Sequence, residues 1–136
     1  MSLAPHLLIN SRSGYRYGSK KIEDHIELDG LSDPYEQIVM GKYGELCATT
    51  HDISRDQQDE YALRSYKLSQ QSITSKHFEN EIVAIEIENK KQKELISQDE
   101  EPFGVKLEKL KRLRPAFTHN GTITAGNASS INDGAA

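Results

Sequence analysis

Residues 121–129 read GTITAGNAS, a run of small and hydroxyl-bearing side chains from which the interpretation of the whole sequence starts. Side chains this small let a ligand or another backbone approach closely. The amides and hydroxyls of the run can form hydrogen bonds with an amide-bearing ligand. The same composition suits a tight crossing between two domains, and the spacing alone does not separate these two interpretations.

Length, charge and cysteine content exclude several classes of protein. The 136 residues support one small domain at most. The single cysteine rules out a disulfide framework within the chain, and no apolar run approaches the roughly 20 residues that a bilayer requires. A net charge of -4 argues against a globally basic nucleic-acid-binding protein. Because 35% of the residues are hydrophobic, the core would be barely large enough for an independent domain. We therefore expect the segment to pack against a larger protein structure.

Two helix starts can be read from the sequence. Asp33 is a good N-cap and Pro34 fits the first helical position, so we expect a first helix from this point. Ser54 and Gln57 have the spacing of a capping box, which predicts a long helix to about Lys76. The buried stripe expected on this second helix consists of Tyr61, Ala62, Ser65, Tyr66 and Ser69, with Leu68 and Ile73 beside it.

The second half of the chain predicts short elements. Alternating side chains indicate a strand over residues 81–88 and another over 94–97, joined by a polar turn at 89–91. Leucines three residues apart predict a short helix over 106–114. A brief strand is expected at 122–124. The fold class predicted from these elements is α+β.

Candidate chemistry is sparse. Cys47 lies near the end of the first expected helix, where the dipole disfavours a thiolate, and we interpret it as a small buried hydrophobe. The five histidines lack the spacing of a metal site, and there is no phosphate-binding glycine loop. The basic segment 106–114 suits phosphate binding, although a solvated helix face is the commoner case. For the Tyr- and Arg-bearing loop 11–21 we favour a protein interface over stacking on bases.

The run at 121–129 and the residues after it resemble a thiolase signature, GTVTAGNAS-x-INDGAA. Other segments resemble thiolase motifs in the same order: MSLAP (1–5) and MS-x-AP, DGLSD (29–33) and DGLTD, ISRDQQD (53–59) and ISREEQD, and LKRLRPAF (110–117) and LAKLRPAF. Within the family the best match is the acetyl-CoA acetyltransferase type. The resemblance covers essentially the whole chain.

The resemblance implies a thiolase-type loop domain, made of helices with short strands and belonging to a larger α/β/α thiolase fold. It divides the chain into a tetramerisation loop and linker (1–30), a CoA-binding loop domain (31–118) and a return segment into the core domain (119–136). Within the first part, residues 5–23 match the loop that joins subunits. The last residues carry no helix stop and no closing turn, so we expect the chain to be part of a longer one.

The resemblance also implies a CoA site. The residues that match family positions around CoA are Leu31, Met40, Lys109, Phe117, Ala125 and Ser129. Ser129 would form a hydrogen bond with a pantetheine amide. Leu31, Met40 and Phe117 would supply apolar walls, and Lys109 would be a polar neighbour of CoA. Val39 stands where the family often has His, and Pro102-Phe103 where it often has Arg, so phosphate contacts are expected from Lys106, Lys109 or Arg112.

The function implied is that of a fragment of an acetyl-CoA C-acetyltransferase, which condenses two acetyl-CoA or cleaves acetoacetyl-CoA. CoA and acetyl-CoA are substrates, and no covalently bound cofactor or metal is expected. The family's catalytic Cys, His and Asn motifs do not occur here, so no catalytic residue is assigned and the chain alone is expected to be inactive. The alternative is a non-catalytic CoA-binding or protein-interaction remnant.

Expected partners are an acyl-CoA, the remainder of the thiolase chain and further copies in a homotetramer, with no nucleic acid and no membrane. A cytoplasmic location is expected, with a mitochondrial one as the alternative, and any targeting signal would lie upstream.

Overall fold

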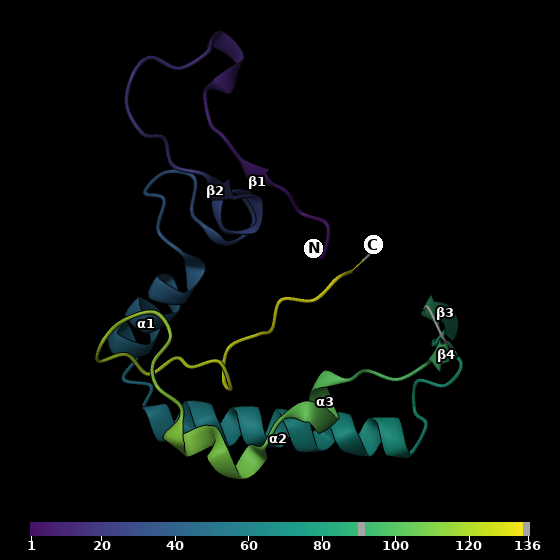
Figure 1. Cartoon of the computed structure of the whole chain (residues 1–136). Helices are drawn as coiled ribbons and strands as arrows, with labels where there is room; N and C mark the ends of the chain where they lie inside the picture. Colours follow the sequence, from purple (N-terminus) through teal and green to yellow (C-terminus); the bar gives the residue numbers. More distant parts are fainter. Residues whose placement is uncertain (90–91, 135–136) are drawn as a thin grey trace.

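The computed structural model describes residues 1–89 and 92–134 (Figure 1). The elements in chain order are β1 (His6–Leu7), a 3-10 turn (Ser11–Ser13), β2 (Glu23–Asp24), a π-helical turn (Ile26–Leu31), α1 (Met40–Thr50), α2 (Arg55–Thr74), β3 (Ile85–Asn89), β4 (Gln92–Ile96), α3 (Glu101–Gly104) and a 3-10 helix (Leu107–Arg112). This mixture of helices and short strands confirms the predicted α+β class.

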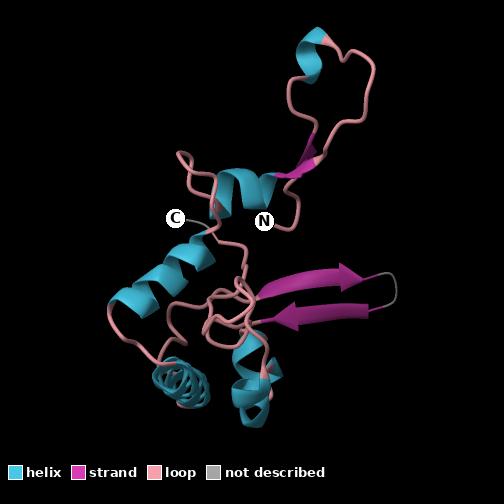
Figure 2. Cartoon of the chain, turned by 90° about the vertical axis from the view of Figure 1, so that its left-hand side faces the viewer, coloured by secondary structure: helices cyan, strands magenta, loops and turns pink. Residues whose placement is uncertain are grey.

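The body of the molecule forms around α2. Both α3 and the 3-10 helix run along α2, and α1 lies at one of its ends (Figure 1). The return segment, described as far as residue 134, passes over this group of helices. Two parts project from the body: the N-terminal arm (residues 6–24), closed at its base by the β1–β2 pair, and the antiparallel hairpin of β3 and β4 (Figure 2).

The first helix begins at Met40, so the predicted start at Asp33 is wrong. Asp33 does accept hydrogen bonds from two backbone amides that follow it, at 2.6 and 3.1 Å. These bonds close a turn and do not continue into a helix, because Gln37 adopts a left-handed conformation with φ of 54°. The chain doubles back there and forms an antiparallel bridge between Ser32 and Val39.

The capping box of α2 is confirmed. The backbone amide of Ser54 donates to Gln57 Oε1 at 2.8 Å, and the amide of Gln57 donates to Ser54 Oγ at 3.3 Å. These two bonds satisfy donors that the first turn of a helix otherwise leaves free. The helix ends at Thr74, two residues before the predicted end.

The apolar core is smaller than the predicted stripe on α2. Among the described residues, the buried aliphatic side chains are Ala48, Ala62 and Leu110. Tyr61 and Leu68, which were expected to be buried or to border the buried stripe, are 73% and 49% exposed, and Ser65 of the expected stripe is exposed as well. The reason is that α3, the 3-10 helix and the return segment pack along one side of α2 and leave the rest of its surface to solvent (Figure 1).

Cys47 is exposed on α1, so its interpretation as a buried hydrophobe is wrong. Its neighbour Ala48 takes the inward position on that helix. Successive helical residues point about 100° apart, so the burial of one says little about the next.

The short elements of the second half lie close to their predicted positions. The first strand starts at Ile85 rather than at residue 81, and its partner covers 92–96 rather than 94–97. The predicted turn at 89–91 falls partly on residues 90 and 91, which lie outside the described residues. The helix expected over 106–114 is a 3-10 helix, and the strand expected at 122–124 is reduced to one bridge between Pro115 and Thr124.

Candidate functional site

Glu45 ties the return segment to α1. Its carboxylate accepts hydrogen bonds from the backbone amide of Thr122 at 2.8 Å, from the Thr122 hydroxyl at 2.9 Å and from the amide of Ile123 at 2.9 Å. Burial by itself raises the pKa of Glu45, but the bonds from Thr122 and Ile123 outweigh it and hold that pKa below its ordinary value. A charged Glu45 therefore fixes the start of the GTITAGNAS run.

Glycines allow the return segment and the residues just before it, which include Phe117, to lie close to α1. A Cβ atom on Gly44 would lie 2.5 Å from Ile123 Cδ1, and one on Gly41 would lie 2.4 Å from the Phe117 ring. A Cβ on Gly121 would lie 2.2 Å from the Glu45 carboxylate. A side chain at any of these three positions would therefore force Ile123, Phe117 or Glu45 to move from its present place.

A buried carboxylate on α2 joins three segments. Asp59, which is 3% exposed, accepts from Arg55 Nε at 2.8 Å and from Asn127 Nδ2 at 2.9 Å. The Arg55 guanidinium also donates through Nη2 to the backbone carbonyls of Leu110 and Leu113, at 3.0 and 3.2 Å. The network therefore links the first turn of α2 to the return segment and to the 3-10 helix.

A tight turn in the return segment packs on the 3-10 helix. Asn127 Oδ1 accepts from the amide of Thr124 at 2.7 Å, and Thr124 is completely buried. A Cβ atom on Gly126 would lie 2.6 Å from Leu113 and 2.8 Å from Leu110. The small residues of the GTITAGNAS run thus allow a close approach between segments of this chain, while a ligand contact and a crossing between two domains both stay predictions.

The end of that run borders a hollow on α2. The hollow measures about 370 Å³ and lies between small side chains of α2, such as Ala62 and Ser65, and the return segment at Ser129. Ser129 is exposed, so its hydroxyl is accessible from solvent. Tyr61 and Tyr66 also line the hollow, so its wall combines hydroxyl groups with aromatic and small side chains.

Glu101 closes one side of the hollow. It accepts from the Tyr66 hydroxyl at 3.1 Å and from the Ser130 hydroxyl. The bond from Ser130, together with that from Tyr66, holds the pKa of Glu101 below its ordinary value, although burial opposes the shift. Gln70 Nε2 donates to the Pro102 carbonyl at 2.6 Å and fixes α3 against α2.

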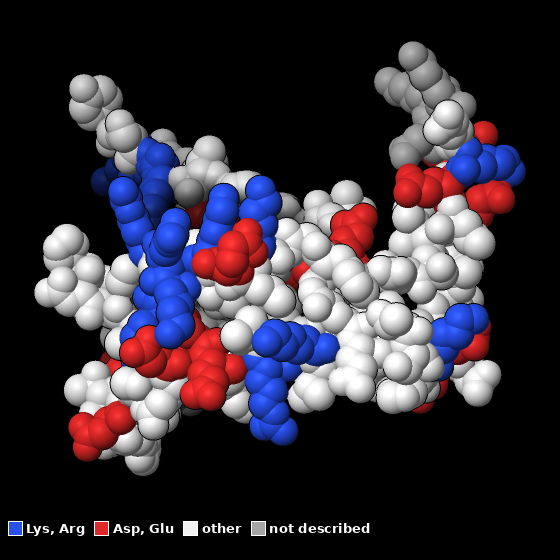
Figure 3. Space-filling model, turned by 90° about the horizontal axis from the view of Figure 1, so that it is seen from below, with Lys and Arg blue, Asp and Glu red and all other residues white. Residues whose placement is uncertain are grey.

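Charges of both signs lie side by side on the face seen from below (Figure 3). In residues 1–89 and 92–134, no group of three or more His, Cys, Asp or Glu side chains is arranged to hold a metal ion. None of the helices in the same residues combines the length and the apolar composition of a bilayer-spanning segment.

Comparison with known proteins identifies the family. The sequence model described as "Thiolase, N-terminal domain" matches residues 1–136. The chain belongs to the thiolase family. Acetyl-CoA acetyltransferase of Schizosaccharomyces pombe is 44% identical over 137 residues, which are 99% of this chain and 35% of that protein.

Two further thiolases agree with this assignment. A protein of Gibberella zeae, described as "Acetyl-CoA acetyltransferase ERG10, cytosolic", is 44% identical over 138 residues, or 100% of this chain and 35% of that one. The solved structure of the Syntrophomonas wolfei acetyl-CoA acetyltransferase superposes with a TM-score of 0.87 at 40% identity, over 95% of this chain and 33% of that one. The chain spans about a third of the length of these relatives.

The structure brings together three of the six residues that the thiolase resemblance assigned to CoA. The antiparallel bridge at Ser32 and Val39 sets Leu31 opposite Met40, and Phe117 packs on Gly41, directly after Met40. Met40 is 62% exposed. We call Leu31, Met40 and Phe117 the apolar group, because the three segments that carry them meet at the start of α1.

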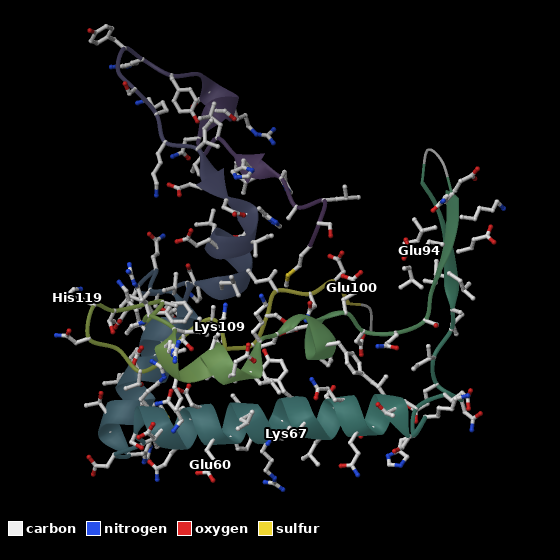
Figure 4. All side chains as sticks on the ribbon, turned by 60° about the horizontal axis from the view of Figure 1, so that its bottom comes forward. Glu60, Lys67, Glu94, Glu100, Lys109 and His119 are labelled. Carbon is white, nitrogen blue, oxygen red and sulfur yellow. The ribbon has the colours of Figure 1, made fainter. Side chains whose placement is uncertain are left out.

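The other three predicted residues, Lys109, Ala125 and Ser129, are separated from Phe117 along the chain by the Pro115–Thr124 bridge. Ala125 and Ser129 are exposed on the return segment, and Lys109 is exposed on the 3-10 helix (Figure 4). Leu110, the residue after Lys109, packs under Gly126, whereas the Lys109 side chain is open to solvent. Ser129 faces the hollow on α2, whereas the apolar group lies at α1.

Sequence reasoning missed the residues that hold these segments in place, namely Glu45, Arg55 and Asp59. One signal was available for two of them: Arg55 and Asp59 are four residues apart on one helix, the spacing of an ion pair. Their burial and their bonds to residues more than 50 positions away could not be read from that spacing.

Proposed function

We propose that this chain forms the CoA-binding and subunit-joining part of an acetyl-CoA C-acetyltransferase, an enzyme that condenses two acetyl-CoA or cleaves acetoacetyl-CoA. The observation that carries the proposal is that the thiolase match runs through the whole chain, in relatives named for this activity. Acyl-CoA is then the substrate, and the remainder of a thiolase chain is the principal partner.

In the proposed site, the group formed by Leu31, Met40 and Phe117 is an apolar wall for the pantetheine chain. Its support is the placement of the three side chains at the start of α1, with Met40 open to solvent. Ala125 and Ser129 contact the same ligand from the return segment, and the Ser129 hydroxyl bonds a pantetheine amide. The exposed ammonium group of Lys109 stands beside the polar part of CoA, where a cation favours phosphate.

Bond making and breaking are assigned to residues outside this chain. The family reaction uses one thiolate to hold the acyl group and a second cysteine to move a proton. This chain contains one cysteine, Cys47, exposed near the C-terminal end of α1. One cysteine cannot fill both of these roles, so the reactive sulfurs are assigned to the remainder of the thiolase chain.

Subunit assembly is assigned to residues 5–23 within a first part that covers residues 1–30. In support, the arm projects from the body, and its side chains are open to contact, with Tyr17 fully exposed (Figure 2). Tyrosine and arginine are enriched at protein interfaces. Residues 31–118 then form the CoA-binding loop domain, and residues 119–136 return to the core domain. A homotetramer active in lipid metabolism in the cytoplasm follows from the same assignment, and a relative described as cytosolic supports that location.

A chimera tests the proposal. Residues 1–136 replace the matching 137-residue segment of the S. pombe enzyme, and acetoacetyl-CoA thiolysis and CoA affinity are measured in the purified product. We expect an active tetramer whose KM for CoA lies within about 10-fold of that of the parent enzyme. Phe117→Ala and Ser129→Ala should each raise that KM about 10-fold, the size expected from loss of an apolar contact or a hydrogen bond.

The matched control is Ser97→Ala, an exposed position outside the proposed CoA and assembly residues, which should leave the KM for CoA unchanged. A chimera that folds and assembles but binds no CoA would contradict the proposal. It would favour the alternative of a protein-interaction remnant.

A further inference from the structure

We propose that Asp59 is a positioning residue, whose buried carboxylate sets the distance between the two CoA-facing segments of the body. This inference rests on the proposed function, because it concerns the same CoA site. One segment is the return segment, which carries Ala125 and Ser129, and the other is the 3-10 helix, which carries Lys109.

The two oxygens of Asp59 have different partners: one binds the return segment directly, and the other binds Arg55, which contacts the 3-10 helix. Oδ1 accepts from Asn127 Nδ2 at 2.9 Å, and Asn127 precedes Ser129 by two residues. Oδ2 accepts from Arg55 Nε at 2.8 Å. Because Asp59 is 3% exposed, water does not compete with either bond.

Arg55 transmits the position of Asp59 to the 3-10 helix. Its Nη2 donates to the carbonyls of Leu110 and Leu113, which follow Lys109 and precede the extended stretch that carries Phe117. A guanidinium holds its donors in one rigid plane, so the angle of the Arg55–Asp59 pair also sets the position of these carbonyls. One carboxylate therefore orients Ser129 from one side and Lys109 and Phe117 from the other.

The hydrogen bonds inside the return segment carry the constraint further. Asn127 also donates to the Thr122 carbonyl at 3.1 Å and accepts from the Thr124 amide at 2.7 Å. The turn at residues 124–127 therefore moves as one unit with Asn127. A shift of Asp59 would displace Ala125 and Ser129 together, without touching the ligand itself.

The test is Asp59→Asn in the chimera described above, with Asp56→Asn as the matched control. The asparagine has the shape of aspartate, but its amino group must face either Arg55 or Asn127, so one buried donor loses its acceptor. Asp56 lies on the same turn of α2, and its side chain is 84% exposed, 3.7 Å from Lys111. Steady-state kinetics give kcat and the KM for CoA of each variant.

We expect Asp59→Asn to raise the KM for CoA about 10-fold while kcat stays within about twofold, and Asp56→Asn to change neither. The split between KM and kcat separates positioning from general loss of folded enzyme, which would lower kcat per mole of protein at an unchanged KM. The proposal is overturned if Asp59→Asn has the KM of Asp56→Asn, or if kcat falls while KM does not rise.

If Asp59→Asn does not assemble, Arg55→Lys decides the question. Lysine keeps the charge opposite Asp59 but cannot reach two carbonyls with a rigid fork, so KM should rise several-fold with kcat retained. An unchanged KM in Arg55→Lys overturns the positioning role while the proposed function stands. Absence of CoA binding in the unsubstituted chimera instead overturns the proposed function, and with it the inference.

Discussion

At the scale of single residues, the body of this molecule is organised around carboxylates more than around apolar side chains. Glu45 and Asp59 each hold a segment that is distant in sequence, and both are satisfied by several donors. Multiple bonds to a charged acceptor are stronger than neutral ones and define one geometry. Such residues can fix the position of an irregular segment, here the return segment, against the helices of the body.

The bonds to Glu45 predict a pH-dependent stability. The pKa of Glu45 is lower in the folded chain than its ordinary value of 4.5, so its contribution to folding is complete above that pH and is lost as the pH falls through the lower, folded-state pKa. Glu45→Gln should lower the free energy of unfolding by about 1–3 kcal/mol at pH 7. The amino group of the glutamine cannot accept hydrogen bonds, so two donors of the return segment lose an acceptor. Urea unfolding between pH 3 and 7 measures both effects.

Glu60→Gln is the control for this prediction, since Glu60 lies on α2 and points away from the return segment (Figure 4). The Glu45→Gln variant should lose part of the acid-side dependence that the unsubstituted chain shows, and the Glu60→Gln variant should keep it. If the free energy of unfolding depends on pH in the same way in all three proteins, Glu45 is not the source of the pH dependence.

The contact between Gly41 and Phe117 predicts a specific loss of CoA affinity. An alanine Cβ at position 41 would lie 2.4 Å from the aromatic ring, so Phe117 must move out of its place in the apolar wall. Gly41→Ala should raise the KM for CoA in the chimera about 10-fold, although alanine favours the helix by about 1 kcal/mol. Gly104→Ala is the control, since a Cβ there meets no described atom within 4 Å. Equal KM values for the two variants would contradict the prediction.

At the scale of elements, the sequence predicted a helix start correctly where the bonds that fix it join residues close together in the chain. The capping box at Ser54 and Gln57 gave the start of α2, because both of its bonds join residues three apart. Asp33 offered a similar signal, but its bonds close a turn, and the left-handed conformation of Gln37 that ends this turn has no mark in the sequence. Strand positions were close because alternation reflects pairing in the β3–β4 hairpin.

The candidate site was less accessible to sequence reasoning. Its six residues came from the family resemblance, not from spacing. The residues that hold them escaped notice because their partners are remote: Glu45 lies 77 positions from Thr122, and Asp59 lies 68 from Asn127. Only the fold brings such pairs together, so neither periodicity nor capping rules could have indicated them.

The cap of α2 predicts a measurable stability. Ser54→Ala removes the acceptor of the Gln57 amide and should destabilise the chain by about 1 kcal/mol. Ser65→Ala, an exposed position within the same helix, is the control and should change the unfolding free energy by less than about 0.5 kcal/mol. Chemical unfolding monitored by helical circular dichroism provides the comparison. Equal losses in both variants would mean that the capping box does not stabilise α2.

At the scale of the whole molecule, the fold presents surfaces instead of enclosing a large core. The N-terminal arm and the β3–β4 hairpin project from the body, and apolar side chains such as Ile85 and Leu95 remain more than half exposed. A two-stranded hairpin alone is marginally stable, so we expect its exposed apolar side chains to pack against another surface. This organisation matches a part that joins and binds.

The 136-residue chain by itself should therefore have no thiolase activity. It contains one exposed cysteine where the family reaction requires two reactive sulfurs. Thiolysis of acetoacetyl-CoA, followed by its loss of absorbance, should not exceed that of a boiled sample. Cys47→Ser is the control for a contaminating thiolase, whose activity the substitution would leave unchanged. Activity above the boiled sample that disappears in Cys47→Ser would contradict the assignment.

The central claim is that CoA lies against the start of α1 and the return segment, and amide hydrogen exchange of the chimera with and without CoA measures this directly. We predict that CoA slows exchange within residues 31–41 and 115–129, with the arm at residues 5–23 unchanged. Protection confined to the arm or to the hairpin, or binding of CoA with unchanged exchange in both predicted stretches, would contradict the claim.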